Sequence, residues 1–331
     1  MVPILVGTIK GYMGVVNKHY KDNKFDEPFC FANDSKTSKL LREQEKFEDE
    51  PSRRIPLSDK MVVKICELAK SDPLGFKAAV CDFVIMGRFG GFRQQEYAMD
   101  SKTEIKYYVK PDGTCVVRAF TVKNFKFYDE DHDVMWKPLL HKEEEAKELG
   151  VVFDIKKNRR NGQETGMVAI PDFPDFNPVK AGLNVLSRAD TLGSTEPDDP
   201  LCVYKEGDHV YYLTGKDITD YYRFVAQLVH PNISDAELKL ISTHSLRVLA
   251  TVLLCEAGKD GPYIKLRLRW LSDCYMVYLR NTNRITEQHA DVLAGVHATM
   301  AAIATVANEA STIVSIECIE DLDMDDLEDE D

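Results

Sequence analysis

Two different periods of apolar and polar residues run along this chain, and they predict many helices and one short group of strands. Helices with one buried face are expected where apolar residues recur every three or four positions. These ranges are 2–20, 35–46, 58–71, 73–87, 178–189, 217–229, 234–241, 243–257 and 285–308. A charged insert at 141–149 is also expected to be helical, and another helical turn is expected to start at Arg93.

Short runs rich in β-branched and aromatic residues lie among the helical ranges. KYYV, TCVVRAF and FKFY fall between residues 103 and 128, with a Pro-Asp-Gly turn at 111–113. VVFDI at 151–155 and MVAI at 167–170 flank KKNRRNGQETG, whose Asn161-Gly162 pair is typical of a hairpin. Helices on both sides of a small antiparallel sheet predict a mainly helical α+β fold.

The segment EDEPSRRIPLS at 48–58 is polar and contains two prolines, which makes it the best candidate for a domain boundary. A length of 331 residues allows one sizeable core and a second domain. The expected order is a short helical piece at 1–50, a linker at 51–58, a larger domain at 59–310 and a tail at 311–331.

The net charge of −13 is concentrated at one end of the chain. Ten acidic residues and no basic ones lie between Glu317 and Asp331, so the rest of the chain carries about −3. The tail is expected to be a disordered acidic extension, either solubilising or competing with nucleic acid. Basic residues cluster at 156–160 and 265–269, and local clusters decide whether nucleic acid can bind.

The eight cysteines are scattered and form no Cys-x-x-Cys pair, which favours unbridged thiols in a reducing compartment and predicts no metal site. No apolar run approaches the ~20 residues that span a bilayer, so no membrane partner is expected. The first residues, MVPILVGTIK, are too short and poorly flanked for a secretory signal.

The most informative residues lie in THSLRVLATVLLCEAG and, after a short loop, in LRLRWLSDCYMVYLR. His244 and Arg247 are three positions apart and therefore share a helix face. Ser242 or Thr243 can cap that helix, whose positive end would then lie beside His244. These features indicate a phosphate site, and a tyrosine downstream supplies a possible nucleophile for it.

Attack of a tyrosine on a DNA phosphodiester would need the residue types that this chain contains. A free tyrosine has a pKa near ~10 and needs cations close by to become a good nucleophile. Arginine forks bind the charged transition state, and a lysine can protonate the leaving oxygen. A phosphotyrosine bond conserves the energy of the broken ester, so neither metal nor ATP is expected as a cofactor.

The order GGFRQQE, a basic residue in a hairpin, HSLR, RW and YLR resembles the tyrosine recombinase, or phage integrase, family. The wording HSLR…AG…LRWLSDCYMVYLR is most similar to recombinases of Crypton- and DIRS-type mobile elements. The resemblance covers roughly 75–310 and implies the catalytic-domain fold of that family. It also implies that 1–50 is part of a helical core-binding region, and that 285–308 docks on a neighbouring subunit or packs on its own domain.

The resemblance implies a catalytic set in which two arginines bind the scissile phosphate. Arg93 lies in GGFRQQE, similar to the family's arginine box, with Glu96 as its acidic companion and Arg88 as a rival. Arg247 would bind the phosphate beside Arg93. His244 would move a proton or donate to a phosphate oxygen.

The resemblance also assigns the remaining catalytic roles. The catalytic lysine is expected in FDIKKNRRNGQ, where Lys157 is favoured because it matches the Lys-Asn placement of the element-borne relatives. Strand alternation sends Lys156 and Lys157 to opposite faces, so only one of them is expected to reach the site. Trp270 would donate its indole N–H, and Tyr278 would be the nucleophile, with Tyr275 as a rival on the same helical face. Further DNA contacts are expected from five basic side chains, namely Lys156, Arg159, Arg160, Arg267 and Arg269.

One position departs from the family pattern, since Arg269 stands before the tryptophan where the family usually has glycine. The expected function is nevertheless site-specific recombination or integration of double-stranded DNA through a 3′-phosphotyrosyl intermediate, by a homo-oligomer. Such a protein would lie in the nucleus of a eukaryote and otherwise in the cytoplasm. The alternative is an inactive, domesticated module that binds DNA or protein.

Overall fold

The computed structural model describes residues 6–32, 35–45, 53–110, 112–136, 138–140, 145–154, 162–270 and 272–279. The chain divides into two compact units, residues 1–53 and residues 54–331. Among the described residues, no helix has the length and apolar content needed to cross a membrane.

The first unit contains α1 (Val6–Asp22) and α2 (Lys36–Glu45). Lys10 of α1 forms an ion pair with Glu45 of α2. The Asn17 side chain accepts from Phe29 N and donates to Phe29 O, which holds the connecting segment against α1. Leu41 is buried, whereas many of the other apolar side chains are exposed.

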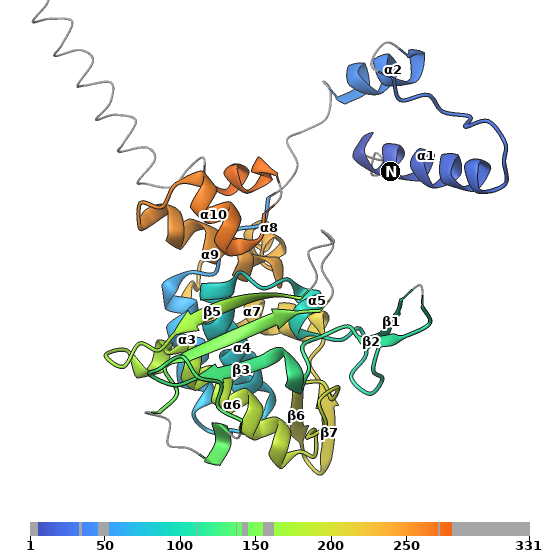
Figure 1. The fold of residues 1–331 in the computed structure, drawn as a ribbon. Coiled ribbons are helices and arrows are strands. Elements are labelled where there is room, and N and C mark those ends of the chain that lie inside the picture. Colours follow the sequence, from blue (N-terminus) through green and yellow to red (C-terminus); the bar gives the residue numbers. More distant parts are fainter. Residues whose placement is uncertain are drawn as a thin grey trace, which may run out of the picture. The chain divides into compact units, whose positions relative to one another are not determined.

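The second unit is mainly helical. Its α-helices are α3 (Asp59–Ala69), α4 (Phe76–Gly90), α5 (Gln94–Tyr97), α6 (Pro178–Thr191), α7 (Gly215–Val229), α8 (Asp235–Leu240), α9 (His244–Glu256) and α10 (Gly261–Leu268). Its 3₁₀ helices are η1 (Val122–Asn124), η2 (Pro138–Leu140), η3 (Pro174–Phe176) and η4 (Asp273–Tyr278). Figure 1 shows α3, α4 and α7 behind a small sheet, with α8, α9 and α10 above it in that view.

The sheet is antiparallel and has the order β3 (Phe125–Tyr128), β4 (Glu148–Phe153), β5 (Gln163–Val168). Two separate hairpins, β1 (Tyr107–Val109) with β2 (Cys115–Val117) and β6 (Val203–Glu206) with β7 (His209–Tyr212), complete the described strands. The prediction of a mainly helical α+β fold with a small antiparallel sheet is confirmed.

The prediction of a helix at 141–149 is wrong at its end. Residues 145–147 are not helical, and β4 begins at Glu148. Leu149, Val151 and Phe153 are buried at every second position, which is the burial pattern of a strand. The charged residues before them masked this period in the sequence, and 141–144 lie outside the described residues.

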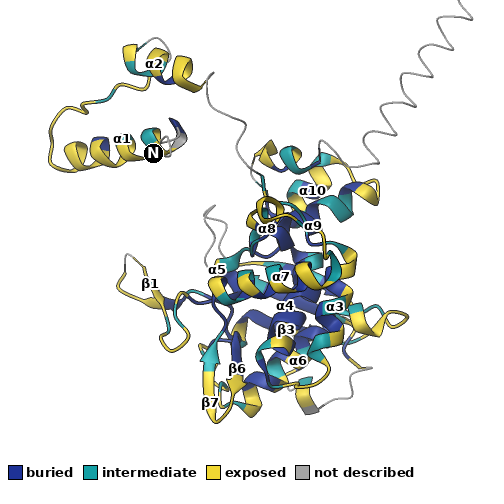
Figure 2. Cartoon of the chain, turned by 180° about the vertical axis from the view of Figure 1, so that it is seen from behind, coloured by how far each residue is buried: buried dark blue, intermediate teal, exposed yellow. Residues whose placement is uncertain are grey.

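The core of the second unit is built around α4, which is buried along most of its length (Figure 2). It packs against α3, α6 and α9. At the contact with α9, a Cβ added to Gly87 would lie 2.5 Å from Leu246 Cδ2, so the two helices approach closely here and a larger residue would force Leu246 to move.

A smaller apolar cluster holds the last described segment in place. Ile264 and Leu268 of α10 pack with Ala250 of α9 and with Tyr275 and Leu279. The sequence predicted a short loop here, but α10 begins after Asp260, whose side chain accepts from Tyr263 N. A helix starting with Gly-Pro has a weak apolar period, which is why the sequence pattern missed it.

Candidate active site

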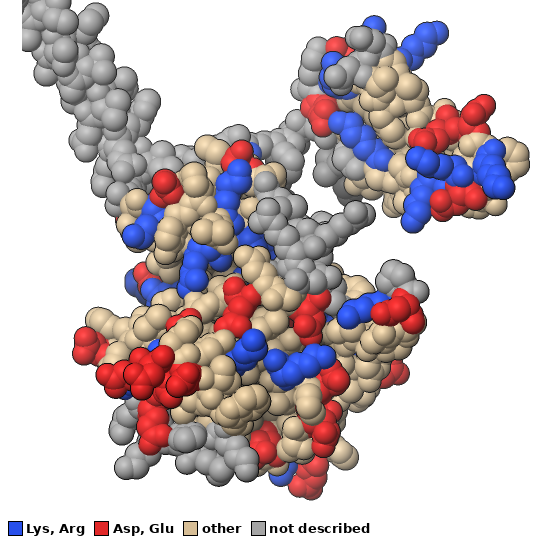
Figure 3. Space-filling view, viewed as in Figure 1, with Lys and Arg blue, Asp and Glu red and all other residues tan. Residues whose placement is uncertain are grey.

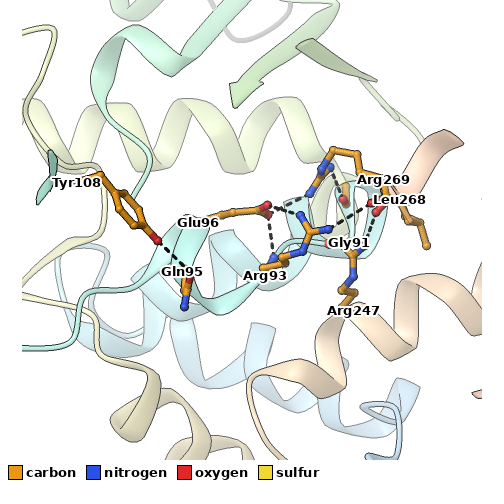
Figure 4. A network of polar contacts seen from close by, with 9 residues as sticks. Gly91, Arg93, Gln95, Glu96, Tyr108, Arg247, Leu268 and Arg269 are labelled. Atoms are coloured by element: carbon orange, nitrogen blue, oxygen red, sulfur yellow. Dashed lines mark hydrogen bonds and ion pairs between the residues drawn. The ribbon is translucent and has the colours of Figure 1, made fainter. Parts of the chain in front are cut away.

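The candidate site lies where three segments of the second unit meet: the turn from α4 into α5, the start of α9, and the segment from the end of α10 to η4. Figure 4 shows the arginines and carbonyls that join them. The sheet also contacts this site, because the Phe153 ring of β4 packs against the Arg269 guanidinium.

Arg247, on the first turn of α9, is almost completely enclosed, with 1% of its surface exposed. Its guanidinium donates to the main-chain oxygens of Gly91 and, at 2.6 Å, of Leu268. The Trp270 ring lies over its other face, with the ring centroid 4.2 Å from Arg247 Cζ. Burial, followed by the charges of Arg93 and Arg269, lowers the pKa of Arg247 to about 9, so it stays a cation at neutral pH.

Arg93 lies at the N-cap of α5 and is partly exposed. Its Nη1 donates to Glu96 Oε1 at 3.1 Å, and its Nη2 donates to the main-chain oxygen of Arg269 at 3.2 Å. The Glu96 carboxylate also accepts from Arg93 N at 2.8 Å. The guanidinium of Arg93 therefore donates to the carbonyl of Arg269, and the guanidinium of Arg247 donates to the carbonyl of the adjacent residue, Leu268 (Figure 4).

Arg269 is buried, although the sequence analysis expected it to contact DNA. Its guanidinium donates to Gly90 O at 2.8 Å and to Glu96 Oε2 at 3.0 Å, and it lies 3.7 Å from the Phe153 ring centroid. Its backbone has φ 58° and ψ 40°, in the left-handed region, where a residue other than glycine costs roughly 1–2 kcal/mol. The side chain therefore points into the protein, and the expected DNA contact does not fit this placement.

His244 and Tyr278 face each other across the site. His244 Nε2 lies 3.0 Å from the Tyr278 hydroxyl. Burial is the main cause that lowers the pKa of His244 to about 4, and the charges of Arg247, Arg54 and Arg93 add to it. The imidazole is therefore neutral at pH 7, and one of its ring nitrogens can accept a proton.

Trp270 lies between Arg247 and Tyr278, with its ring centroid 6.3 Å from that of the tyrosine. Its Nε1 is buried and meets no hydrogen-bond partner among the residues that the structure describes. A buried donor of this kind is uncommon, since most buried polar groups are paired. An incoming acceptor beside Arg247 would satisfy it.

Tyr275, the rival nucleophile, lies in a different environment. It is 4% exposed, belongs to the small apolar cluster, and its hydroxyl lies close to Gly261 at the start of α10. Desolvation by burial is the first cause that raises its pKa. Tyr278 is partly exposed, and it is this tyrosine that meets His244. The two side chains were predicted to share a helical face, but η4 directs them to different surroundings.

Four predicted basic residues, Lys156, Lys157, Arg159 and Arg160, lie outside the described residues. Arg267 is partly buried and donates to Gly166 O of β5. Figure 3 shows Lys and Arg side chains gathered over the part of the surface formed by α9 and α10. Among the described residues, no group of three or more His, Cys, Asp or Glu is placed to hold a metal ion.

The main-chain acceptors of the site could not be read from the sequence. Gly90 and Gly91 supply carbonyls to Arg269 and Arg247, and Leu268 supplies another. The double glycine was a usable signal, because Gly91 has φ 56° and ends α4 in the left-handed region. Ser242, one of the two predicted caps of α9, accepts from His244 N at 3.3 Å, whereas Thr243 makes no side-chain cap.

No protein-family model and no curated protein matches the sequence. Solved structures similar to this one include the Tn1549 transposon integrase in complex with circular intermediate DNA, at 13% identity and a TM-score of 0.44, covering 87% of this chain and 79% of that one. The XerH site-specific recombinase bound to a palindromic difH substrate has 10% identity and a TM-score of 0.46, covering 86% and 65%. The XerA recombinase has 15% identity and a TM-score of 0.39, covering 88% and 84%. At such scores, the assignment below depends on the geometry of the site.

Proposed function

We propose that this chain is a tyrosine-type DNA strand transferase that carries out site-specific recombination or integration, of the kind found in Crypton- and DIRS-type mobile elements. The observation that carries the proposal is the 3.0 Å contact between the Tyr278 hydroxyl and His244 Nε2 beside the paired guanidiniums of Arg93 and Arg247. A nucleophile, a neutral acceptor and two cations are the groups needed for attack on a phosphodiester.

In the proposed reaction, a DNA phosphate approaches Arg93 and Arg247, and its oxygens take up guanidinium N–H groups and the indole N–H of Trp270. The Tyr278 oxygen attacks phosphorus while His244 accepts its proton. The bond from phosphorus to the 5′-oxygen breaks, and Lys157 protonates that oxygen. A 3′-phosphotyrosyl bond remains, and the 5′-hydroxyl of a second strand reverses the steps to release the tyrosine.

Burial first, and then the nearby cations, lower the pKa of His244 before the phosphate binds. A bound phosphate carries negative charge, which would offset these cations and make the imidazole a stronger base. The proton acceptor would thus become effective when substrate is present. We further propose double-stranded DNA as the partner of a homo-oligomer, with 59–310 as the catalytic domain, 1–50 as a partial core-binding region and 311–331 as an acidic tail.

The test is trapping of the covalent intermediate. The full chain is incubated with nicked duplexes of randomised sequence, whose broken strand diffuses away after cleavage, and denaturation-resistant adducts are counted. Tyr278→Phe should abolish the adduct, and Tyr275→Phe, the matched control in the same 3₁₀ helix, should retain it. Loss of the adduct in Tyr275→Phe alone would make Tyr275 the nucleophile.

The second candidate function is a non-catalytic module that binds DNA or protein. One observation favours it: the Arg247 guanidinium is 1% exposed and already bonded to two carbonyls, so phosphate binding needs a rearrangement. Folded protein that binds duplex DNA but forms no adduct with any sequence would support this function over the first.

A further inference from the structure

The turn after α10 and the turn after α4 hold each other by hydrogen bonds that run in both directions. From the first turn, the Arg269 side chain donates to Gly90 O and Glu96. From the other side, Arg93 donates to Arg269 O, and Arg247 donates to Leu268 O. The carbonyl of Gly90 in the turn after α4 thus orients Arg269 of the other turn. The carbonyls of Arg269 and Leu268 in the turn after α10 orient Arg93 and Arg247.

Arg269 is an unusual residue for this role, because its backbone adopts the left-handed conformation that favours glycine. Among the described residues, only Lys24 and His132 share a positive φ without being glycine, and both are exposed. Arg269 is 7% exposed, and its side chain contacts three separate elements: the end of α4, α5 and β4. A strained backbone is thus combined with a buried side chain whose two terminal nitrogens are hydrogen-bonded.

Glu96 links this anchor to the partly exposed arginine of the site. Its Oε2 accepts from Arg269 Nη2 and from Arg93 N, while its Oε1 accepts from Arg93 Nη1 (Figure 4). Arg93 is therefore held at both ends of its guanidinium, by Glu96 on one side and by Arg269 O on the other. Movement of Arg269 would release the contact of Arg93 with the Arg269 carbonyl and shift the adjacent Leu268 carbonyl that Arg247 binds.

We propose that Arg269 is a positioning residue: its buried side chain fastens the 268–270 turn to the 90–96 turn, so that the carbonyls of residues 268 and 269 hold Arg247 and Arg93 side by side for one phosphate. The inference rests on the proposed function, because it concerns the geometry in which the two cations meet that phosphate. Arg269 itself touches no substrate.

The experiment compares Arg269→Gly with Arg188→Lys. Glycine suits the backbone at position 269, so the turn keeps its conformation and loses only the side-chain anchor. Arg188 is a matched control, since it is 3% exposed, pairs with the buried Asp82 and donates to Pro73 O, away from the proposed site. Arg188→Lys disturbs a buried arginine–carboxylate pair elsewhere in the same unit and keeps its charge, so it tests whether perturbing any buried pair slows cleavage.

Two quantities are measured at a temperature where both variants are folded: the rate of adduct formation at saturating DNA and the Kd for DNA. For Arg269→Gly, the rate should fall at least tenfold while Kd changes by less than threefold, because the cations remain but are misaligned. Arg188→Lys should cleave at the rate of the unsubstituted protein. Arg269→Lys should recover part of the lost rate, since its ammonium can still reach Glu96.

A second measurement needs no cleavage. Of the two tryptophans, Trp136 is 90% exposed, so Trp136→Phe leaves Trp270, over Arg247, as the single reporter of the turn. In this background, Arg269→Gly should shift the emission of Trp270, and Arg188→Lys should not.

Cleavage by Arg269→Gly at the unsubstituted rate, or an equal loss in Arg188→Lys, would overturn the inference and leave the proposed function intact. Failure of the unsubstituted protein to form any adduct would overturn both. An unchanged Trp270 emission in Arg269→Gly would show that the turn does not depend on this anchor and would also overturn the inference.

Discussion

Replacing Glu96 with Gln removes one charge from the centre of the site and nearly preserves the shape of the side chain. Glu96 and Arg269 are 8% and 5% exposed as side chains, and their atoms are 3.0 Å apart. Breaking a buried ion pair at one partner leaves an uncompensated charge and costs about 3–5 kcal/mol. Arg93 is 26% exposed, so its contact with Glu96 adds little because solvent screens it.

The free energy of unfolding of Glu96→Gln should therefore fall by about 3–5 kcal/mol, a large part of the ~5–15 kcal/mol typical of a protein. Urea unfolding at pH 7, followed by tryptophan fluorescence, should show the midpoint about 1–2 M lower. The matched control is Asp220→Asn, which breaks the exposed Lys216–Asp220 pair on α7 and should leave the unfolding midpoint nearly unchanged, because solvent screens this pair. A loss below about 1 kcal/mol in Glu96→Gln, or an equal loss in the control, would refute the buried bridge.

Three further outcomes are expected. The pKa of His244 is about 4 in the folded protein, below the ~6.5 of an unfolded chain. The contribution of His244 to stability should therefore be complete above pH ~6.5 and be lost as the pH falls towards 4. A midpoint above 6 in an NMR titration of His244 would contradict this. Gly87→Ala should lower the free energy of unfolding in urea by about 1–3 kcal/mol, because the added Cβ overlaps Leu246. Gly113→Ala serves as a comparison, because a Cβ there meets no other atom and only the strain of the positive φ remains. Asp82→Asn should cost about 3–5 kcal/mol by isolating the buried Arg188, and a double-mutant cycle with Arg188→Met should recover part of it.

The pattern of apolar and polar residues was sufficient to predict the long helices but not the short helices and strands. α3, α4, α6, α7 and α9 lie close to their predicted ranges, because each has an apolar face with the period of a helix. The β6–β7 hairpin was missed, since most of its residues outside the first two are exposed and show no alternating burial. η4 was expected to be an ordinary helix, and its tighter winding depends on how Tyr275 packs into the small cluster.

The candidate site divides in the same way. His244 and Arg247 could be selected from residue types and local spacing, whereas Trp270 and Tyr278 were selected through the resemblance to tyrosine recombinases. The catalytic roles of all four stay predictions. The buried course of Arg269 could not be foreseen, because an arginine beside a tryptophan in a basic segment is also typical of a surface that contacts nucleic acid. Only its partners, Glu96 and the Gly90 carbonyl, distinguish the two cases.

Residue order alone specified where the long helices run and which side chains could meet a phosphate, because periodicity and spacing are properties of neighbouring residues. The pairing of carbonyls with guanidiniums arose only in the folded chain. Arg247 reaches Gly91 across 156 positions, and Arg93 reaches Arg269 across 176. Every residue has a carbonyl, so no sequence signal marks the acceptor. The packing of α9 on α4 and of α10 on α9 decides which carbonyls come within reach of each arginine.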